Sequence, residues 1–236
     1  MPTAKENRAL VIEGDLVRVQ RTTIEREVKT SDFISEIARM QPLDTGPLPQ
    51  GCVWFTRCEG QGNRIVSVYV IERPAGMQNI RFEASAHNAE QEVIKDLVLS
   101  WPITLWFVRC QGDVIQDLHI ACTQAPVADE GRDTKLHGLL MPNQYDLGQG
   151  AVCLGNLVLK DGVPLVRRVE ELVRQTVDSL WNSDLMPHFE GAGITGLDDW
   201  AEHSAANPEF HAQIQFPEHD QQTVGNMLEH LLETPA

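Results

Sequence analysis

One segment of the chain gathers the side chains that could carry out nucleophilic chemistry. It runs from His137 to Asn156 and contains a single cysteine, Cys153. Polar or turn-forming residues precede that cysteine: Pro142, Asn143, Tyr145, Asp146 and Gly148. A free thiol with a pKa near ~8.5 is already a few per cent ionised at neutral pH, so Cys153 could act as a nucleophile without a dedicated base. The surrounding stretch, Val127–Gly162, has few helical or strand signals, and such long loops are often functional.

The other four cysteines indicate neither a metal site nor a redox pair. They are Cys52, Cys58, Cys110 and Cys122. Cys52 and Cys58 are too far apart for a C-x(2–4)-C zinc half-site, and no second pair completes one. The chain also has no Cys-x-x-Cys, which disfavours a thiol redox protein. We expect these four side chains to be reduced packing groups, and we expect no metal or cofactor.

Charge and hydropathy exclude several classes of protein. The net charge of −15 disfavours nucleic-acid binding, which needs a basic surface. The longest apolar runs, Leu97–Val108 and Ile65–Ile71, are too short or too interrupted to span a bilayer. The N-terminal MPTAKENRAL has no apolar signal core, so we expect a cytoplasmic protein. No Lys or Arg follows Arg174, so the acidic C-terminal part is either a solvated face or a docking surface for a basic partner.

The first part of the chain predicts a hairpin, a helix and then strands. Ala9–Val19 predicts a short hairpin, with Leu10, Ile12, Leu16 and Val17 as its apolar residues and a turn at Glu13-Gly14-Asp15. Ser31 can cap a short helix that ends before Pro42, and a Pro- and Gly-rich connector follows. Strands are predicted at Cys52–Arg57, Ile65–Ile71, Asn79–Glu83 and Val114–Cys122, with a turn at Glu72–Gly76. Leu97–Val108 is strand-like but contains Pro102, which cannot donate to a ladder, so this stretch is either split there or placed at a sheet edge.

Two helices are predicted in the last part of the chain. Pro164 starts the first, and Val166, Val169, Val173, Val177 and Leu180 form one apolar stripe along it. Beyond Trp181, GAGITG and NPEF are loop-like. A final amphipathic helix covers Thr223–Leu232, and its apolar face either packs on the domain or binds a partner. Strands followed by helices indicate an α+β fold.

The order of motifs in the irregular segment resembles the ubiquitin-conjugating fold. That fold places Pro-Asn, an aromatic residue, a glycine turn and a Val-Cys-Leu between its sheet and a long helix, and here they are Pro142-Asn143, Tyr145, Gly148 and Val152-Cys153-Leu154. The closer resemblance is to the prokaryotic ubiquitin-conjugating-like family D, which includes protein B of the PRTRC systems. It rests on these further motifs: Leu48-Pro49 before Trp54-Phe55, Arg73–Gly76, His137, Cys153–Asn156 and Trp181-Asn182-Ser183.

The resemblance implies a ubiquitin-conjugating-like antiparallel sheet with an N-terminal helix, an active-site loop and C-terminal helices. The domain boundaries that follow are 1–44 for the N-terminal hairpin and helix, 45–190 for the core and 191–236 for an acidic C-terminal extension. Cys153 would carry a ubiquitin-like modifier as a thioester, received from a ThiF-like activating enzyme, and pass it to an acceptor. A JAB-type peptidase belongs to the partners implied, whereas nucleic acid and membrane do not.

Asn143 takes a catalytic role by the same resemblance. Its neutral amide would stabilise the negative charge that develops on the thioester carbonyl, and losing such a donor typically costs on the order of 10²–10³ in rate. The residues that would support the loop are His137, Pro142, Tyr145, Asp146, Gly148 and Asn156. Without the resemblance, Asn143 is an ordinary turn residue and His137 an ordinary structural histidine.

A second hypothesis is a catalytically inactive adaptor of the same fold, which binds the modifier or the activating enzyme without forming a thioester. Two departures from the family favour it. Met141 stands where the family usually has a histidine, and Leu147–Gly150 makes the spacing from Asn143 to Cys153 longer than in eukaryotic relatives. Extra glycine-containing length either bulges without consequence or displaces Asn143 from Cys153.

Overall fold

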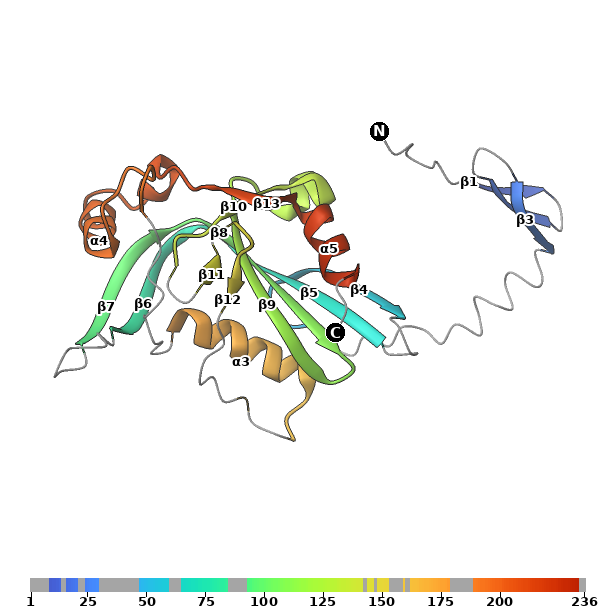
Figure 1. Cartoon of the computed structure of the whole chain (residues 1–236), viewed down its shortest axis with the longest axis horizontal. Coiled ribbons are helices and arrows are strands. Elements are labelled where there is room, and N and C mark those ends of the chain that lie inside the picture. Colours follow the sequence, from blue (N-terminus) through green and yellow to red (C-terminus); the bar gives the residue numbers. More distant parts are fainter. Residues whose placement is uncertain are drawn as a thin grey trace. The chain divides into compact units, whose positions relative to one another are not determined.

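The structure is a computed structural model in which the chain forms two units, Met1–Pro47 and Leu48–Ala236 (Figure 1). The residues described are 9–13, 16–20, 24–29, 47–59, 65–84, 93–141, 144–146, 148–152, 159, 162–178 and 189–233. Side chains are described for 47–58, 65–81, 96–141, 148–152, 159, 162–176 and 189–233.

The N-terminal unit contains a three-stranded antiparallel sheet. Its strands are β1 (Ala9–Glu13), β2 (Leu16–Gln20) and β3 (Ile24–Lys29), in the order β1-β2-β3. The pairing of Glu13 with Leu16 confirms the hairpin predicted over Ala9–Val19. The third strand, β3, was not predicted. The helix expected after Ser31 lies outside the described residues.

The larger unit is built around a meander of four antiparallel strands. These are β4 (Cys52–Glu59), β5 (Ile65–Arg73), β8 (Ile103–Gln111) and β9 (Val114–Thr123), which lie side by side in that order. β5 and β8 are buried over most of their length. Since both faces of the sheet are covered, their apolar runs are continuous rather than alternating. The strands predicted in these four places are confirmed.

The hairpin formed by β5 and β8 continues through two further strands, β6 (Gly76–Ala84) and β7 (Val93–Trp101). Arg73 lies opposite Thr104 before the junction, and Gly76 lies opposite Trp101 after it. The two residue numbers have the same sum in both pairs. The pairing register of the β5–β8 ladder therefore continues unchanged into the β6–β7 ladder. In Figure 1 this second half curves away from the first.

Two prolines stand where the hairpin bends. Pro74 and Pro102 fall between the two ladders, and neither has an N–H to donate, so the ladder is interrupted there. The split of Leu97–Val108 at Pro102 is therefore confirmed. The turn predicted at Glu72–Gly76 is wrong, because the chain does not reverse there: the strand bends and continues.

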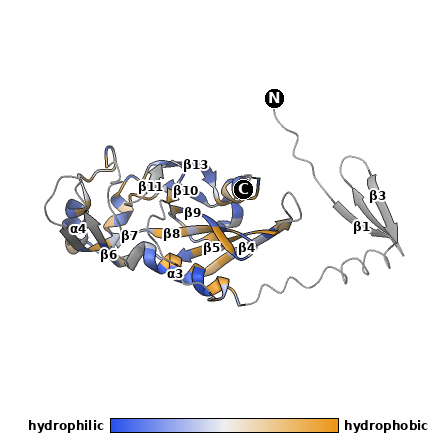
Figure 2. Ribbon diagram, turned by 60° about the horizontal axis from the view of Figure 1, so that its bottom comes forward, coloured by the Kyte–Doolittle hydropathy of each residue, from blue (hydrophilic) through white to orange (hydrophobic). Residues whose placement is uncertain are grey.

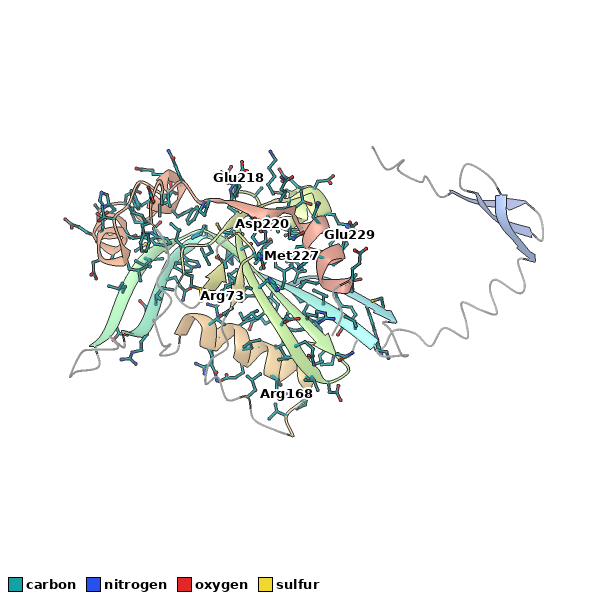
Figure 3. All side chains as sticks on the ribbon, in the orientation of Figure 1. Arg73, Arg168, Glu218, Asp220, Met227 and Glu229 are labelled. Atoms are coloured by element: carbon teal, nitrogen blue, oxygen red, sulfur yellow. The ribbon has the colours of Figure 1, made fainter. Side chains whose placement is uncertain are left out.

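Two helices cover opposite faces of the meander. α3 (Leu165–Asp178) lies on one face and α5 (Val224–Glu233) on the other, which confirms both predicted helices (Figure 1). The apolar side of α3 faces the sheet (Figure 2). Met227 of α5 is buried against the sheet, whereas Glu229 is exposed on the outer side of the helix (Figure 3).

Each face has its own hydrophobic cluster. The cluster under α3, called here the α3 cluster, includes Tyr69, Ile71, Trp106, Val108, Leu118, Ile120, Val169, Leu172 and Val173. The cluster under α5 includes Val68, Val70, Leu105, Phe107, Ala121, Val224, Met227, Leu228 and Leu231. Consecutive residues of one strand thus belong to different clusters, as the period-two geometry of a strand requires.

The acidic C-terminal segment is folded and belongs to the larger unit. α4 (Leu197–Ala206), which was not predicted, contacts β7. Trp200 is fully buried and stacks on Trp101, with ring centroids 5.3 Å apart and planes 4° apart. Its Nε1 donates to the carbonyl oxygen of Ser100 at 3.1 Å. The sequence alone left open whether this segment folds.

Several short elements complete the unit. They are α2 (Val127–Glu130), η1 (Gly131–Asp133), β10 (Lys135–Gly138), β11 (Gln144–Asp146), β12 (Ala151–Val152), η2 (Phe210–Gln213) and β13 (Glu218–Thr223). The structure therefore confirms the α+β class. Within the parts of the chain described, no helix is both long and apolar enough to cross a membrane.

Candidate functional site

The segment singled out in the sequence lies along the outer edge of β9. His137 and Gly148 are fully described, and Tyr145 and Asp146 are described through their backbone in β11. Pro142, Asn143, Cys153 and Asn156 lie outside the described residues. The structure thus describes Met141, before Pro142-Asn143, and Val152, before Cys153. The positions of the Asn143 and Cys153 side chains stay predictions.

Both halves of the predicted motif start from the hydrophobic core. Leu139, Leu140 and Met141, which precede Pro142, are at most 2% exposed. Val152, which precedes Cys153, is 7% exposed. All four belong to the α3 cluster. Met141, directly before Pro142, and Val152, directly before Cys153, thus both lie in the core.

Met141 has a packing role in this arrangement. Its side chain is 2% exposed, and its N–H donates to the carbonyl oxygen of Leu139 at 2.9 Å. A thioether at this position fills apolar space and offers no strong hydrogen-bond donor or acceptor. Position 141 is thus a core position.

The two ends of the segment pair with the same edge of β9. His137 of β10 lies opposite Cys122, and Ala151 of β12 lies opposite His119. His119 and Cys122 are three residues apart, which corresponds to about 10 Å along a strand. The strands at the two ends of this loop, β10 and β12, thus both pair with β9.

The turn at Gly148–Gly150 is fixed by three hydrogen bonds to its carbonyl oxygens. Gly148 O accepts from the N–H of Asp220 at 2.7 Å, and Gly150 O accepts from the N–H of Ile120 at 2.8 Å. Gln149 O lies 2.9 Å from His119 Nδ1. The turn that leads into Cys153 is therefore held by β13 on one side and β9 on the other.

Glycine is required at position 150. Its φ is +64°, in the left-handed region. A Cβ there would lie 2.3 Å from the carbonyl oxygen of Ile120 and 3.0 Å from Nε2 of His219. The first atom belongs to the backbone of a central strand and cannot move aside. The longer loop between Asn143 and Cys153 thus contains a specific close contact with the sheet.

His119 is a hydrogen-bond donor to this turn. Because a carbonyl oxygen can only accept, Nδ1 carries the ring hydrogen in its contact with Gln149. Burial lowers the pKa of His119 below the usual histidine value, although the Gln149 carbonyl and Asp117 act in the opposite direction. The ring of His230 from α5 packs edge-on at 6.4 Å between centroids.

The four described cysteines differ in their suitability as nucleophiles. Burial raises the pKa of Cys110 to about 12, and burial also raises the pKa of Cys122. Burial raises the pKa of the half-buried Cys52 as well. Cys110 and Cys122 are thus the packing groups that the sequence predicted. Among the residues with described side chains, no group of three or more His, Cys, Asp or Glu could hold a metal ion.

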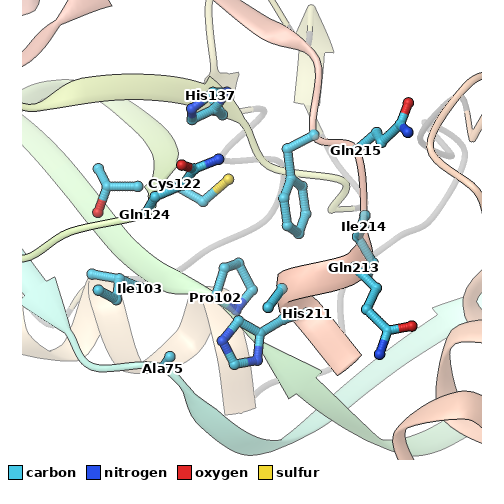
Figure 4. Close-up of a pocket in the computed structure, with 13 residues that line it drawn as sticks. Ala75, Pro102, Ile103, Cys122, Gln124, His137, His211, Gln213, Ile214 and Gln215 are labelled. Carbon is cyan, nitrogen blue, oxygen red and sulfur yellow. The ribbon is translucent and has the colours of Figure 1, made fainter. Parts of the chain in front are cut away.

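His137 of β10 lines two adjoining hollows. It lines a cavity of about 700 Å³ at the bend of the long hairpin (Figure 4). It also lines an adjoining hollow of about 590 Å³ beside α2 and η1. The structure thus places His137 in a groove.

Sequence reasoning missed His119, Gln149 and Gly150. The positive φ of Gly150 and the hydrogen bond of His119 both depend on strands that are distant in the chain. The available signal was weak: His119 is on the polar side of a half-buried strand, and Gly150 is the second glycine of Gly-Gln-Gly.

A scan against protein-family models, a search of the curated proteins and a search of the solved structures each gave no match.

Proposed function

We propose that this chain is a ubiquitin-conjugating-like protein that carries a small protein modifier as a thioester on Cys153 and transfers it to an acceptor amine. The observation that carries the proposal is the burial of Met141 and Val152 in one cluster. Pro142-Asn143 and Cys153 directly follow these two core residues. The two halves of the motif therefore both follow residues of the same hydrophobic cluster.

The order of elements supports the proposal. A four-stranded antiparallel meander comes first, an irregular segment on the edge of its last strand follows, and then comes α3 across one face. This is the order expected for a ubiquitin-conjugating-like core with an active-site loop between sheet and helix. Fold order alone does not define activity, so the proposal depends on the chemistry of the loop.

The chemistry requires an accessible thiol and a donor for the oxyanion. The thiolate of Cys153 would attack the thioester carbonyl of the modifier held by the activating enzyme, and the sulfur of that enzyme would leave as a thiolate. In the second step an acceptor amine attacks the new thioester, the C–S bond breaks, and the departing Cys153 thiolate takes up the proton that the nitrogen loses. Asn143 would donate to the carbonyl oxygen in the second step, when the amine attacks.

The anchored turn supports a positioning role for Gly148–Gly150. Three carbonyl hydrogen bonds hold this turn, and only two residues separate Gly150 from Cys153. A rigid backbone directly before a nucleophile reduces the conformational freedom that this side chain must lose before it reacts. The additional residues between Asn143 and Cys153 would then contribute to fixing the cysteine.

The test is reconstitution with a candidate modifier, a ThiF-like activating enzyme and ATP. We expect an adduct that reducing thiols remove, that Cys153→Ala abolishes and that Cys58→Ala retains. Cys58 is the matched control because it is half-buried on the edge strand β4. Asn143→Ala should leave adduct formation in place and slow discharge to an amine on the order of 10²-fold. Modifier binding without any adduct would instead support the inactive adaptor.

A further inference from the structure

A groove runs along the upper edge of the sheet, and none of the loop chemistry uses it. It is formed by the two adjoining hollows that share Gln124 and His137, and we call it the His137 groove. One half lies at the bend of the long hairpin, between Pro102 and the segment around Ile214 (Figure 4). The other half lies beside α2 and η1, next to Glu130 and Asp133.

The half at the bend has an apolar floor and an amide rim. The floor is formed by Pro102, Ile103, Cys122, Ile214 and Phe216. Three exposed amides stand around it: Gln124, Gln213 and Gln215. An amide side chain offers both donors and an acceptor, which is what the N–H and C=O groups of a peptide need. An apolar floor gives one side chain of such a peptide a place to be buried.

His211 adds a hydrogen-bond acceptor to this half of the groove. Ser100 Oγ donates to the carbonyl oxygen of Pro208 at 2.7 Å, and it lies 2.9 Å from His211 Nδ1. A hydroxyl has a single hydrogen, so Nδ1 of His211 donates in this contact. The other ring nitrogen, Nε2, is then an acceptor, and the ring lines the cavity (Figure 4).

Charge selects the kind of peptide. Glu130 and Asp133 are exposed in the second half of the groove, and no ion pair involving either is found among the described side chains. Glu218 lies opposite His137 on β13. Lys135 is the single lysine or arginine among the residues that line the two hollows. The chain as a whole carries −15, so its field also favours a cation.

We propose that the His137 groove binds an extended, basic segment of a partner protein, with an apolar side chain over Ile103 and Phe216 and a lysine or arginine beside Glu130 and Asp133. This goes beyond thioester transfer and does not depend on Cys153. Nucleic acid is not a fit, since carboxylates flank the groove.

The test is fluorescence polarisation with the full chain and two labelled peptides. The first peptide alternates lysine and leucine with glycine, and the second has glutamate in place of lysine. We expect saturable binding of the basic peptide alone. Cys153→Ala should bind it unchanged, so a failure of the thioester proposal leaves this result intact.

Two variants locate the binding. Glu130→Lys with Asp133→Lys should weaken it about tenfold, and Ala212→Trp, which places a bulky ring at the exposed rim of the cavity, should weaken it at least as much. The matched control is Glu190→Lys with Glu202→Lys, which changes the net charge equally at exposed positions outside the groove. It should change the affinity less than about twofold.

Four results would overturn the proposal. One is equal weakening by the control pair, which would mean attraction by net charge alone. Another is unchanged binding in Ala212→Trp when circular dichroism shows a native fold. The third is an absence of saturable binding, and the fourth is equal binding of the glutamate peptide.

Discussion

At the scale of single residues, the turn before Cys153 depends on groups that are far away in the sequence. Gly148, Gln149 and Gly150 each accept a hydrogen bond, and the donors come from β13 and β9. Hydrogen bonds of this kind contribute roughly 1 kcal/mol each, and ordering the turn costs conformational entropy of a similar size. The turn is therefore stable only if its backbone adds no strain. Glycine at position 150 meets this condition because it adopts a positive φ without strain.

Gly150→Ala should lower the free energy of unfolding by roughly 2–3 kcal/mol, because a methyl group would combine a left-handed φ with a clash against Ile120 O. Denaturant unfolding measures this. Gly112→Ala is the matched control: its φ is +56°, but a Cβ there meets no atom within 4 Å. It should cost only about 1 kcal/mol. Equal losses in both variants would contradict the close contact.

His119 should make stability depend on pH. Burial lowers its pKa in the folded state, so the unfolded chain takes up a proton at a higher pH than the folded chain does. The free energy of unfolding should therefore fall as the pH drops below about 6.5, the value for an unperturbed histidine. His211, whose pKa is also lowered by burial, acts in the same direction.

His119→Asn tests this dependence, because asparagine has an amide donor near the Nδ1 position and does not titrate. We expect a shallower loss of stability between about pH 7 and pH 5 than in the unsubstituted chain. Gln116→Asn, at an exposed position without a titratable group on the same strand, serves as the control and should keep the original slope. An unaltered slope in His119→Asn would show that this ring does not govern the acid sensitivity.

At the scale of elements, the long hairpin is the feature that gives the unit its two halves. One register runs through both ladders, and the prolines at 74 and 102 interrupt it. α3 and α5 cover the first half, and α3 also contacts β6 of the second half. α4 contacts β7 of the second half through Trp200. The bend also opens the cavity that Pro102 and Ile103 line.

Trp200→Ala should destabilise the larger unit by about 3–5 kcal/mol, because it removes a fully buried ring, its stacking on Trp101 and its hydrogen bond to Ser100. Urea unfolding followed by circular dichroism measures the loss. Glu202→Ala, on the exposed side of the same helix, should stay within about 0.5 kcal/mol. A small effect of Trp200→Ala would mean that α4 is not part of the core.

The sequence predicted elements whose signal is local. The apolar runs of β5 and β8 and the stripes of α3 and α5 identified those strands and helices correctly. Arg73-Pro74-Ala75-Gly76 has the composition of a turn, and only its long-range register shows that the strand continues. β13, with the polar sequence EHDQQT, and α4, with a weak apolar stripe, form because of partners that the sequence does not reveal. The same is true of the contacts of Gly150 and His119.

At the scale of the whole molecule, the residues from Leu48 onward form a unit with its own core. β13 and α5 complete this core, since Val224, Met227 and Leu231 are at most 1% exposed. A chain comprising 48–236 should unfold cooperatively, with a midpoint within a few degrees of the full chain. A chain that ends at Gln215 should lose this cooperative transition. Thermal unfolding decides, and a cooperative transition in the shorter chain would contradict the role assigned to α5.

Alkylation of the native protein by iodoacetamide as a function of pH, resolved by residue with mass spectrometry, tests directly whether Cys153 is an accessible nucleophile. We expect Cys153 to react first, with an apparent pKa at or below about 8.5, as is typical of an accessible thiol. Cys110 and Cys122 should react only on unfolding, because burial raises their pKa. If Cys153 reacts as slowly as these two buried thiols, it cannot carry a modifier, and the account is wrong.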